Sequence, residues 1–301
     1  MPNEIKWNNR FCIGVDSVDR AHEKLFTIVG KLINLNEDET KQQHACREGI
    51  KYFNSYAMKH FADEEVYMKS INYAGYAMHK ELHDNLRDET LPALEAELEE
   101  HGYSTESVRH FLGICIGWLN AHIMIEDYAI TGKRTSKWTH PAAENDTDAL
   151  SKTFSHSLET LCHSKTQEVT QHYGGEDFSS GKTLCYRLTY ISKDKSTLQF
   201  YLVFEDSLVL RTLSDILGQD FPKIDQTAVS AMQILAEQLV GTLRGHFMAD
   251  KKYLLEKSDL MTFEQFVRTF DKEYPPYSLL FSVGGHGYCA FCADQVPFLQ
   301  I

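Results

Sequence analysis

The sequence lacks the features that would direct it into a membrane or an oxidising compartment. It does not open on the basic, apolar and small-residue pattern of a signal peptide. Of its two long uncharged runs, 111–125 is shorter than the roughly 20 apolar residues of a membrane span, and 274–293 is interrupted by proline and glycine. Its seven cysteines are odd in number and scattered, which favours reduced thiols over a disulfide framework. We therefore expect a cytoplasmic protein that does not cross or bind a membrane.

Positive charge is also scarce. Thirty basic residues stand against 43 acidic ones, which gives a net charge of -13. Such a chain repels phosphate backbones, so we expect no nucleic-acid partner and favour a protein or a small ligand. With 301 residues, 43% of them hydrophobic, the chain is long enough for two domains with packed cores.

Two pairs of polar residues have the spacing of metal ligands on a helix. His60 and Glu64 are four residues apart, as are His79 and His83. At about 100° per residue, a separation of four places both side chains on one helical face. Glu65 is a competing carboxylate, but the spacing from His60 favours Glu64. One such pair among 14 histidines arises easily by chance, so the case depends on the pairs occurring together.

Apolar residues at helical spacing predict four amphipathic helices in the first 133 residues. The first begins at Asp19, the second spans about 41–68, the third follows the turn at 72–75, and the fourth is capped within 104–106. Short turns between them predict an all-α four-helix up-down bundle, a fold that builds metal sites from inward-pointing side chains.

Every predicted helix carries candidate ligands. Five imidazoles and two carboxylates are too many for one tetrahedral zinc ion but suit two divalent metal ions bridged by carboxylates. For the last carboxylate, helix geometry alone favours Glu126, which is four residues after His122, over Asp127, which is five residues away and about 140° around an ideal helix. The candidate set is His22, His60, Glu64, His79, His83, His122 and Asp127.

The rest of the chain has a different pattern. A polar stretch, 134–147, predicts a linker between domains 1–133 and 148–301. The second domain has mixed periodicity and is predicted to be α+β. Its expected helices are 148–162, 207–217, 225–248 and 262–270, and its expected strands are 166–173, 184–191, 198–204, 277–283 and 288–293. Cys289 and Cys292 form a lone CxxC whose side chains would point to opposite faces of a strand, so we expect no metal there.

Residues 1–133 resemble bacterial hemerythrin domains. The shared residues are Trp7, Phe11, Ile13-Gly14-Val15, Asp19-Arg-Ala-His22, His60-Phe61, Glu64-Glu65, Met68, His79-x-x-x-His83, Trp118-Leu119, His122 and Asp127. The resemblance selects Asp127 over Glu126.

The hemerythrin resemblance implies a non-haem di-iron site with dioxygen as its ligand. By position, His79, His83 and His122 would hold one iron ion, and His22 and His60 the other, which would keep the open coordination position. Glu64 and Asp127 would bridge the two ions together with an oxo or hydroxo group. Trp118 would line the oxygen pocket and limit the access of water.

Residues 148–296 are similar to the CheX/CheC chemotaxis phosphatase family in the order of their elements and in two segments, Phe204-Glu-Asp-Ser-Leu-Val and Ala236-Glu237-Gln-Leu-Val240-Gly241. Members of that family use a Glu followed three residues later by an Asn to position a water molecule against an aspartyl phosphate. Glu237 matches the Glu as a candidate catalytic residue, but Val240 stands at the Asn position. Valine can orient neither water nor phosphate, which favours a protein that is not an enzyme.

Three functions follow as hypotheses. The first is an oxygen sensor whose di-iron bundle regulates a CheX-like signalling domain, through a homodimer formed by that domain or through a response-regulator partner. The second is a response-regulator phosphatase under oxygen control. The third is an oxygen carrier or storage protein. Carriage requires only the bundle, so the fused second domain favours signalling.

Overall fold

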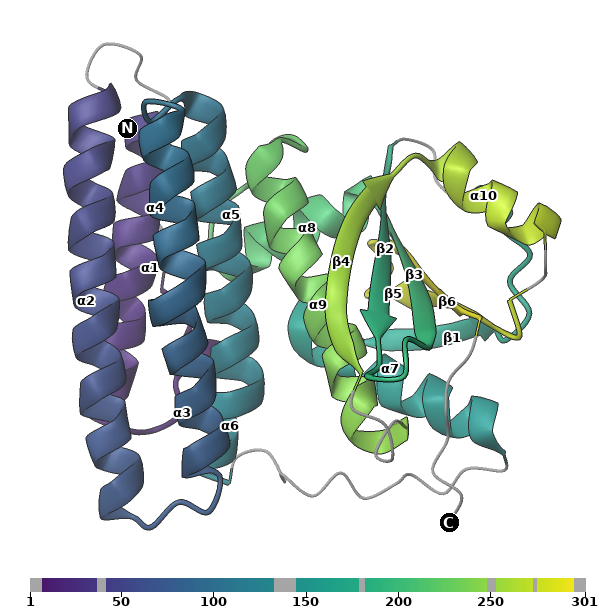
Figure 1. The fold of residues 1–301 in the computed structure, drawn as a ribbon, viewed down its shortest axis with the longest axis horizontal. Coiled ribbons are helices and arrows are strands. Elements are labelled where there is room, and N and C mark those ends of the chain that lie inside the picture. Colours follow the sequence, from purple (N-terminus) through teal and green to yellow (C-terminus); the bar gives the residue numbers. More distant parts are fainter. Residues whose placement is uncertain are drawn as a thin grey trace. The chain divides into compact units, whose positions relative to one another are not determined.

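The computed structural model describes residues 7–36, 42–132, 145–178, 182–247, 253–272 and 275–294. Residues 134–144 of the predicted linker, 134–147, lie outside the described residues, and a helix begins at Asp146, so the linker boundaries stay a prediction. The helical part and the part with the β-sheet are described below one at a time (Figure 1).

Four long helical segments form the N-terminal part, as predicted. The first two are α1 (Asp16–Asn36) and α2 (Gln42–Ser70). The third joins α3 (Tyr76–Asn85), the π-helical η2 (Leu86–Thr90) and α4 (Leu91–Glu100). The fourth joins α5 (Thr105–Ala121), the π-helical η3 (His122–Asp127) and α6 (Tyr128–Ile130). Neighbours along the chain run in opposite directions, and α1 also contacts α5, which closes the up-down bundle (Figure 1).

The ends of these helices follow from their sequence. Ser104 caps α5, because its side chain accepts a hydrogen bond from the Ser107 N–H, as predicted for this segment. The start of α1 differs from the prediction, since the helix begins at Asp16 and not at Asp19. The Asp19 carboxylate accepts hydrogen bonds from the Ile13 and Gly14 N–H groups instead, so it ties the preceding arm, including the short 3₁₀ turn η1 (Asn9–Phe11), to the helix.

The fourth helical segment is the most apolar of the bundle. The continuous helix Thr105–Ile130 is long and hydrophobic enough to cross a membrane, but 78% of its most apolar window is buried inside the protein. Phe111 and Ile116 are fully buried, as are Leu25 and Val29 of α1, a helix that contacts α5. Packing within the bundle therefore accounts for its composition, as in the core helix of a soluble protein.

One antiparallel sheet organises the C-terminal part. Its strands are β1 (Thr166–Thr170), β2 (Thr183–Ile191), β3 (Thr197–Glu205), β4 (Leu254–Met261), β5 (Tyr277–Val283) and β6 (Gly287–Ala293). They lie in the order β1-β5-β6-β3-β2-β4, and all five neighbouring pairs are antiparallel. The helices are α7 (Asp146–Cys162), α8 (Asp206–Leu217), α9 (Gln226–Phe247) and α10 (Phe263–Lys272). The predicted α+β class is confirmed.

Helices cover both faces of this sheet. On one face, Phe154 of α7 packs against Phe281 and Phe291, with ring centroids 5.3 and 4.7 Å apart. On the other face, Phe266 of α10 joins a cluster with Tyr201 of β3. Successive side chains of a strand point to opposite faces of the sheet. Since helices cover both faces, most of β3 is buried.

The structure adds one strand that the sequence did not predict. Strand β4 reads LLEKSDLM, with three charged residues in eight and mostly exposed side chains, so it lacks an apolar face. It is an edge strand held by pairing with β2. The two cysteines of the CxxC point to opposite faces of the sheet, as predicted: Cys292 packs in the cluster with Phe266, Cys289 points to the other face, and both are buried thiols.

Candidate metal centre

The seven predicted ligands converge inside the helical bundle. They come from all four helical segments, and none of them is more than 5% exposed. Seven ionisable side chains in an apolar interior are costly unless they pair with one another or bind metal.

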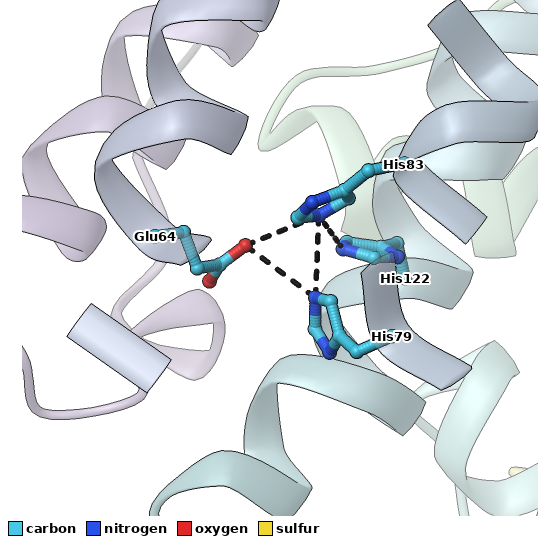
Figure 2. Close-up of side chains that lie close together, drawn as sticks. All are labelled: Glu64, His79, His83 and His122. Atoms are coloured by element: carbon cyan, nitrogen blue, oxygen red, sulfur yellow. Dashed lines mark hydrogen bonds and ion pairs between the residues drawn. The ribbon is translucent and has the colours of Figure 1, made fainter. Parts of the chain in front are cut away.

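Three histidine nitrogens and one carboxylate form the first group. The Nε2 atom of His83 lies 3.2 Å from Nε2 of His79 and 3.0 Å from Nε2 of His122. Glu64 Oε2 is 3.3 Å from Nε2 of His83 and 3.5 Å from Nε2 of His79 (Figure 2). Ligand atoms at right angles around one ion, each about 2.1 Å from it, lie about 3.0 Å apart. These four residues are spaced to hold a metal ion together.

His22, His60 and Glu64 form the second group. Glu64 belongs to both groups, with Oε2 also 3.9 Å from Nε2 of His60. Asp127 spans the groups in a similar way, since its Oδ1 lies 3.1 Å from His122 Nε2 and its Oδ2 lies 3.2 Å from His22 Nε2. A carboxylate that faces two ligand groups is placed to bridge two metal ions.

The hydrogen bonding of these groups is incomplete without a cation. Both carboxylate oxygens of Glu64 and of Asp127 are buried and accept no hydrogen bond from any residue that the structure describes, despite the nearby imidazoles. The Nε2 atom of His83 faces the Nε2 atoms of both His79 and His122. A neutral imidazole carries a hydrogen on only one of its two nitrogens, so these three nitrogens cannot all pair through hydrogen bonds with one another. A cation between these atoms would satisfy the oxygens and nitrogens together, so the residues present fit a pair of divalent metal ions.

The pKa values of His60, His122 and the two carboxylates suit metal binding. Burial lowers the pKa of His60 to about 3 and that of His122 to about 4, which leaves both imidazoles neutral at pH 7. Burial raises the pKa of Glu64 and of Asp127, but the surrounding histidines outweigh it and hold both pKa values below their usual range. Neutral imidazoles and ionised carboxylates are the forms that bind a metal. Burial lowers the pKa values of His22 and His79, but the nearby Asp127 and Glu64 carboxylates outweigh it and raise both.

Two aromatic rings lie flat against the ligand rings. Phe61 stacks on His83 with centroids 4.2 Å apart and planes at 15°, and Trp118 stacks on His122 at 4.2 Å and 13°. Both contacts restrict rotation of the imidazoles. Trp118 is half-buried and covers His122 of the three-histidine group, so its place in an oxygen pocket stays a prediction.

A π-helical turn decides between Glu126 and Asp127. In η3 the Tyr128 N–H donates to the carbonyl of Ile123, five residues earlier. This wider turn brings the fifth residue, and not the fourth, back above the first. Asp127 is accordingly fully buried beside His122, whereas Glu126 is half-buried. The spacing argument favoured the wrong residue here because it assumes the 100° per residue of an α-helix.

The candidate site of the C-terminal part is far less complete. Glu237 lies on α9, where it accepts a hydrogen bond from Gln233 Nε2 at 3.1 Å, and burial raises its pKa. Val240, three residues later, is fully buried in the core. This stretch of α9 therefore presents one carboxylate without a polar partner at the Asn position.

Comparison with known proteins found similarities for each part of the chain. Over the C-terminal half, the chain is similar to the chemotaxis protein CheX from Vibrio vulnificus, with 8% identity and a TM-score of 0.35 over 48% of this chain and 95% of that one. It is also similar to a CheC-like protein from Shewanella oneidensis, with 12% identity and a TM-score of 0.33 over 48% and 93% of the two chains.

The N-terminal part has relatives in sequence. Bacteriohemerythrin from Clostridium acetobutylicum is 30% identical over 125 residues, which are 40% of this chain and 94% of that protein. Myohemerythrin from Theromyzon tessulatum is 27% identical over 133 residues, 44% of this chain and 96% of the relative. The model of the hemerythrin HHE cation-binding domain matches residues 13–133. Through this bundle, the chain belongs to the hemerythrin family.

Proposed function

We propose that the N-terminal bundle holds two non-haem iron ions and binds dioxygen. The observation that carries this proposal is the pair of buried ligand groups that share Glu64. His79, His83 and His122 would hold one iron ion and His22 and His60 the other, with Glu64 and Asp127 between them. The second ion would have fewer protein ligands and hence the open position for oxygen.

The protein residues would control what the metal pair does. A di-iron pair supplies electrons for reversible oxygen binding. The buried Glu64 and Asp127 offset the charge of the ions, which an apolar interior tolerates poorly. The ring of Trp118 over His122 would keep water from the centre, and exclusion of water slows irreversible oxidation.

We infer that oxygen binding is read as a signal. A bundle alone suffices to carry oxygen, yet this chain adds a second folded part of about 150 residues with its own sheet and cores. The segments that resemble the CheX/CheC family point to a signalling or dimerisation role for that part in the cytoplasm. Oxygen at the iron pair would then change a homodimer or the binding of a response regulator.

Metal content and the visible spectrum test the first step. The purified protein is expected to contain about two iron ions per chain and to gain a visible absorption band on oxygenation that is lost when oxygen is removed. A protein with one metal ion per chain, or with no reversible band, would contradict the oxygen-binding proposal.

The oligomeric state tests the signalling step. Light scattering on deoxygenated, oxygenated and fully oxidised protein should give a mass or a dimer dissociation constant that depends on the iron state. An identical dissociation constant in all three states, together with unchanged response-regulator binding, would leave oxygen carriage or storage as the better function.

Phosphatase activity is the remaining alternative, with Glu237 as its acidic residue. The buried Val240 in place of an Asn argues against it, because no side chain there can orient water. We expect phosphorylated response regulators to keep the same phosphate lifetime with the wild-type protein as with Glu237→Ala. A shorter lifetime that depends on Glu237 would establish the enzyme instead.

A further inference from the structure

A second carboxylate, Glu65, approaches the metal cluster from outside. It follows Glu64 on α2, but its side chain points to a different neighbour and is 14% exposed. Its Oε1 atom lies 3.4 Å from Nδ1 of His83, the ring nitrogen that faces away from the other ligands. Glu65 therefore contacts a candidate ligand without belonging to either ligand group.

The contact at Nδ1 determines which nitrogen of His83 carries the hydrogen. The Nε2 atom of His83 lies among the ligand atoms, so it must offer its lone pair to a metal ion. A neutral imidazole with a free lone pair on Nε2 carries its hydrogen on Nδ1, which then donates to Glu65. His79 differs, because its Nδ1 is buried without a hydrogen-bond partner among the described residues.

Glu65 is itself held from the outside. The Tyr76 hydroxyl donates to its second oxygen, Oε2, at 3.5 Å. The ammonium group of Lys69 lies 4.9 Å from the centre of the Tyr76 ring, a cation–π distance. The groups thus form a line from the exposed Lys69 through Tyr76 and Glu65 to His83, while Phe61 stacks on the same imidazole.

We propose that Glu65 is a positioning residue that fixes the tautomer and ring orientation of His83 and makes it a stronger ligand. A carboxylate that accepts the outer N–H of a histidine ligand raises the basicity of the inner nitrogen, so a divalent metal ion at the three-histidine group is held more tightly. Tyr76 supports this role by orienting Glu65. The inference rests on the proposed metal binding and adds a residue that does not touch the metal.

The test is metal affinity, measured on the full-length apoprotein with Co²⁺ in competition with a chelator. Glu65→Gln keeps the shape of the side chain and removes the charge, and it is expected to weaken binding at the three-histidine group by about 10- to 100-fold. Tyr76→Phe should have a smaller effect in the same direction. The matched control is Asp63→Asn, which removes an exposed charge from the same helix and should leave Co²⁺ affinity unchanged.

A spectroscopic readout separates positioning from general support of the fold. In the Co²⁺-loaded protein, the exchangeable Nδ1–H resonance of His83 should shift in Glu65→Gln and stay in place in Asp63→Asn, whereas the other ligand resonances should not move. Equal Co²⁺ affinity and an unmoved resonance in Glu65→Gln would overturn the inference. So would loss of helix content in the Glu65→Gln apoprotein. If the wild-type protein itself does not bind Co²⁺, the proposed metal function fails first.

Discussion

At the scale of single residues, the candidate centre is defined by groups whose hydrogen bonding is incomplete. Glu64 and Asp127 are fully buried, and within the described part of the chain their oxygens accept no hydrogen bond. Native proteins rarely leave such groups unsatisfied, because each costs about 1–3 kcal/mol, and more when it is charged. The arrangement becomes favourable once cations lie between the carboxylates and the imidazoles.

Asp127→Asn should remove metal, whereas Glu126→Gln should not. The Asp127 carboxylate faces ligands of both groups, whereas the amide of an asparagine at this position would be a neutral and weaker metal ligand. We expect iron in Asp127→Asn to fall from about two ions per chain to about one or less, as measured on protein loaded under identical conditions. The reverse order, with more iron lost from Glu126→Gln, would show that the helix-arithmetic assignment was right.

Trp118→Leu should shorten the life of the oxygen-binding form. The indole ring covers His122 at 4.2 Å, and a smaller side chain would admit water. We expect the oxygen-dependent absorption band to decay several-fold faster, while iron content stays the same. Trp7→Phe is the control, because the Trp7 ring packs on Phe11 and Phe26, at about 6 Å between centroids, and not on the ring of a candidate ligand. Equal decay in both variants and the wild type would assign Trp118 to packing alone.

At the scale of elements, π-helical turns interrupt both the third and the fourth helical segments. η3 spans His122 to Asp127, and η2 begins three residues after His83. The wide turn in η3 resolves the five-residue spacing that an α-helix would place about 140° apart. Turns of this kind concentrate at functional sites, where the side-chain direction they provide offsets their poorer backbone geometry.

The arm before α1 is a second element whose position depends on one side chain. Asp19→Ala would leave the Ile13 and Gly14 N–H groups without the acceptor that fixes the arm, and with it the buried Phe11. We expect the free energy of unfolding of the apoprotein to fall by about 1–3 kcal/mol in urea titrations. Asp16→Ala, which alters only an exposed first-turn charge, should cost at most about 1 kcal/mol. Equal losses would mean that the arm is held by its apolar residues alone.

At the scale of the whole molecule, the central question is whether the two parts are coupled. The bundle matches 94% of the length of the bacteriohemerythrin, so we expect residues 1–133 to fold and bind metal alone. Coupling between a binding site and a second part must be reciprocal.

Oxygen affinity of the full chain and of residues 1–133 therefore separates sensing from carriage. A sensor should show a difference of about 5- to 150-fold, the usual range of a coupling free energy of 1–3 kcal/mol. The measurement is oxygen titration of both proteins after identical reduction. Equal oxygen affinities of the two proteins, with equal iron content, would mean that oxygen binding is not coupled to the second part and would favour storage.

The sequence by itself determined the bundle and most of the centre. The periodicity of apolar residues is a local property, so it placed the four helical segments and the pairs His60/Glu64 and His79/His83 on single faces. The same local signals placed five of the six strands. They did not place β4, because its charged residues suit an exposed edge and the strand is held by its pairing with β2.

Only the tertiary structure decided the features that depend on backbone geometry or on distant partners. The π-helical turn that presents Asp127 has no signature in residue spacing, and the sequence needed a family resemblance to select that residue. The approach of Glu65 to His83, 18 residues away along the chain, arises from the packing of α2 against α3. Spacing along one helix fixes directions around that helix, whereas contacts between helices are set by how their side chains pack.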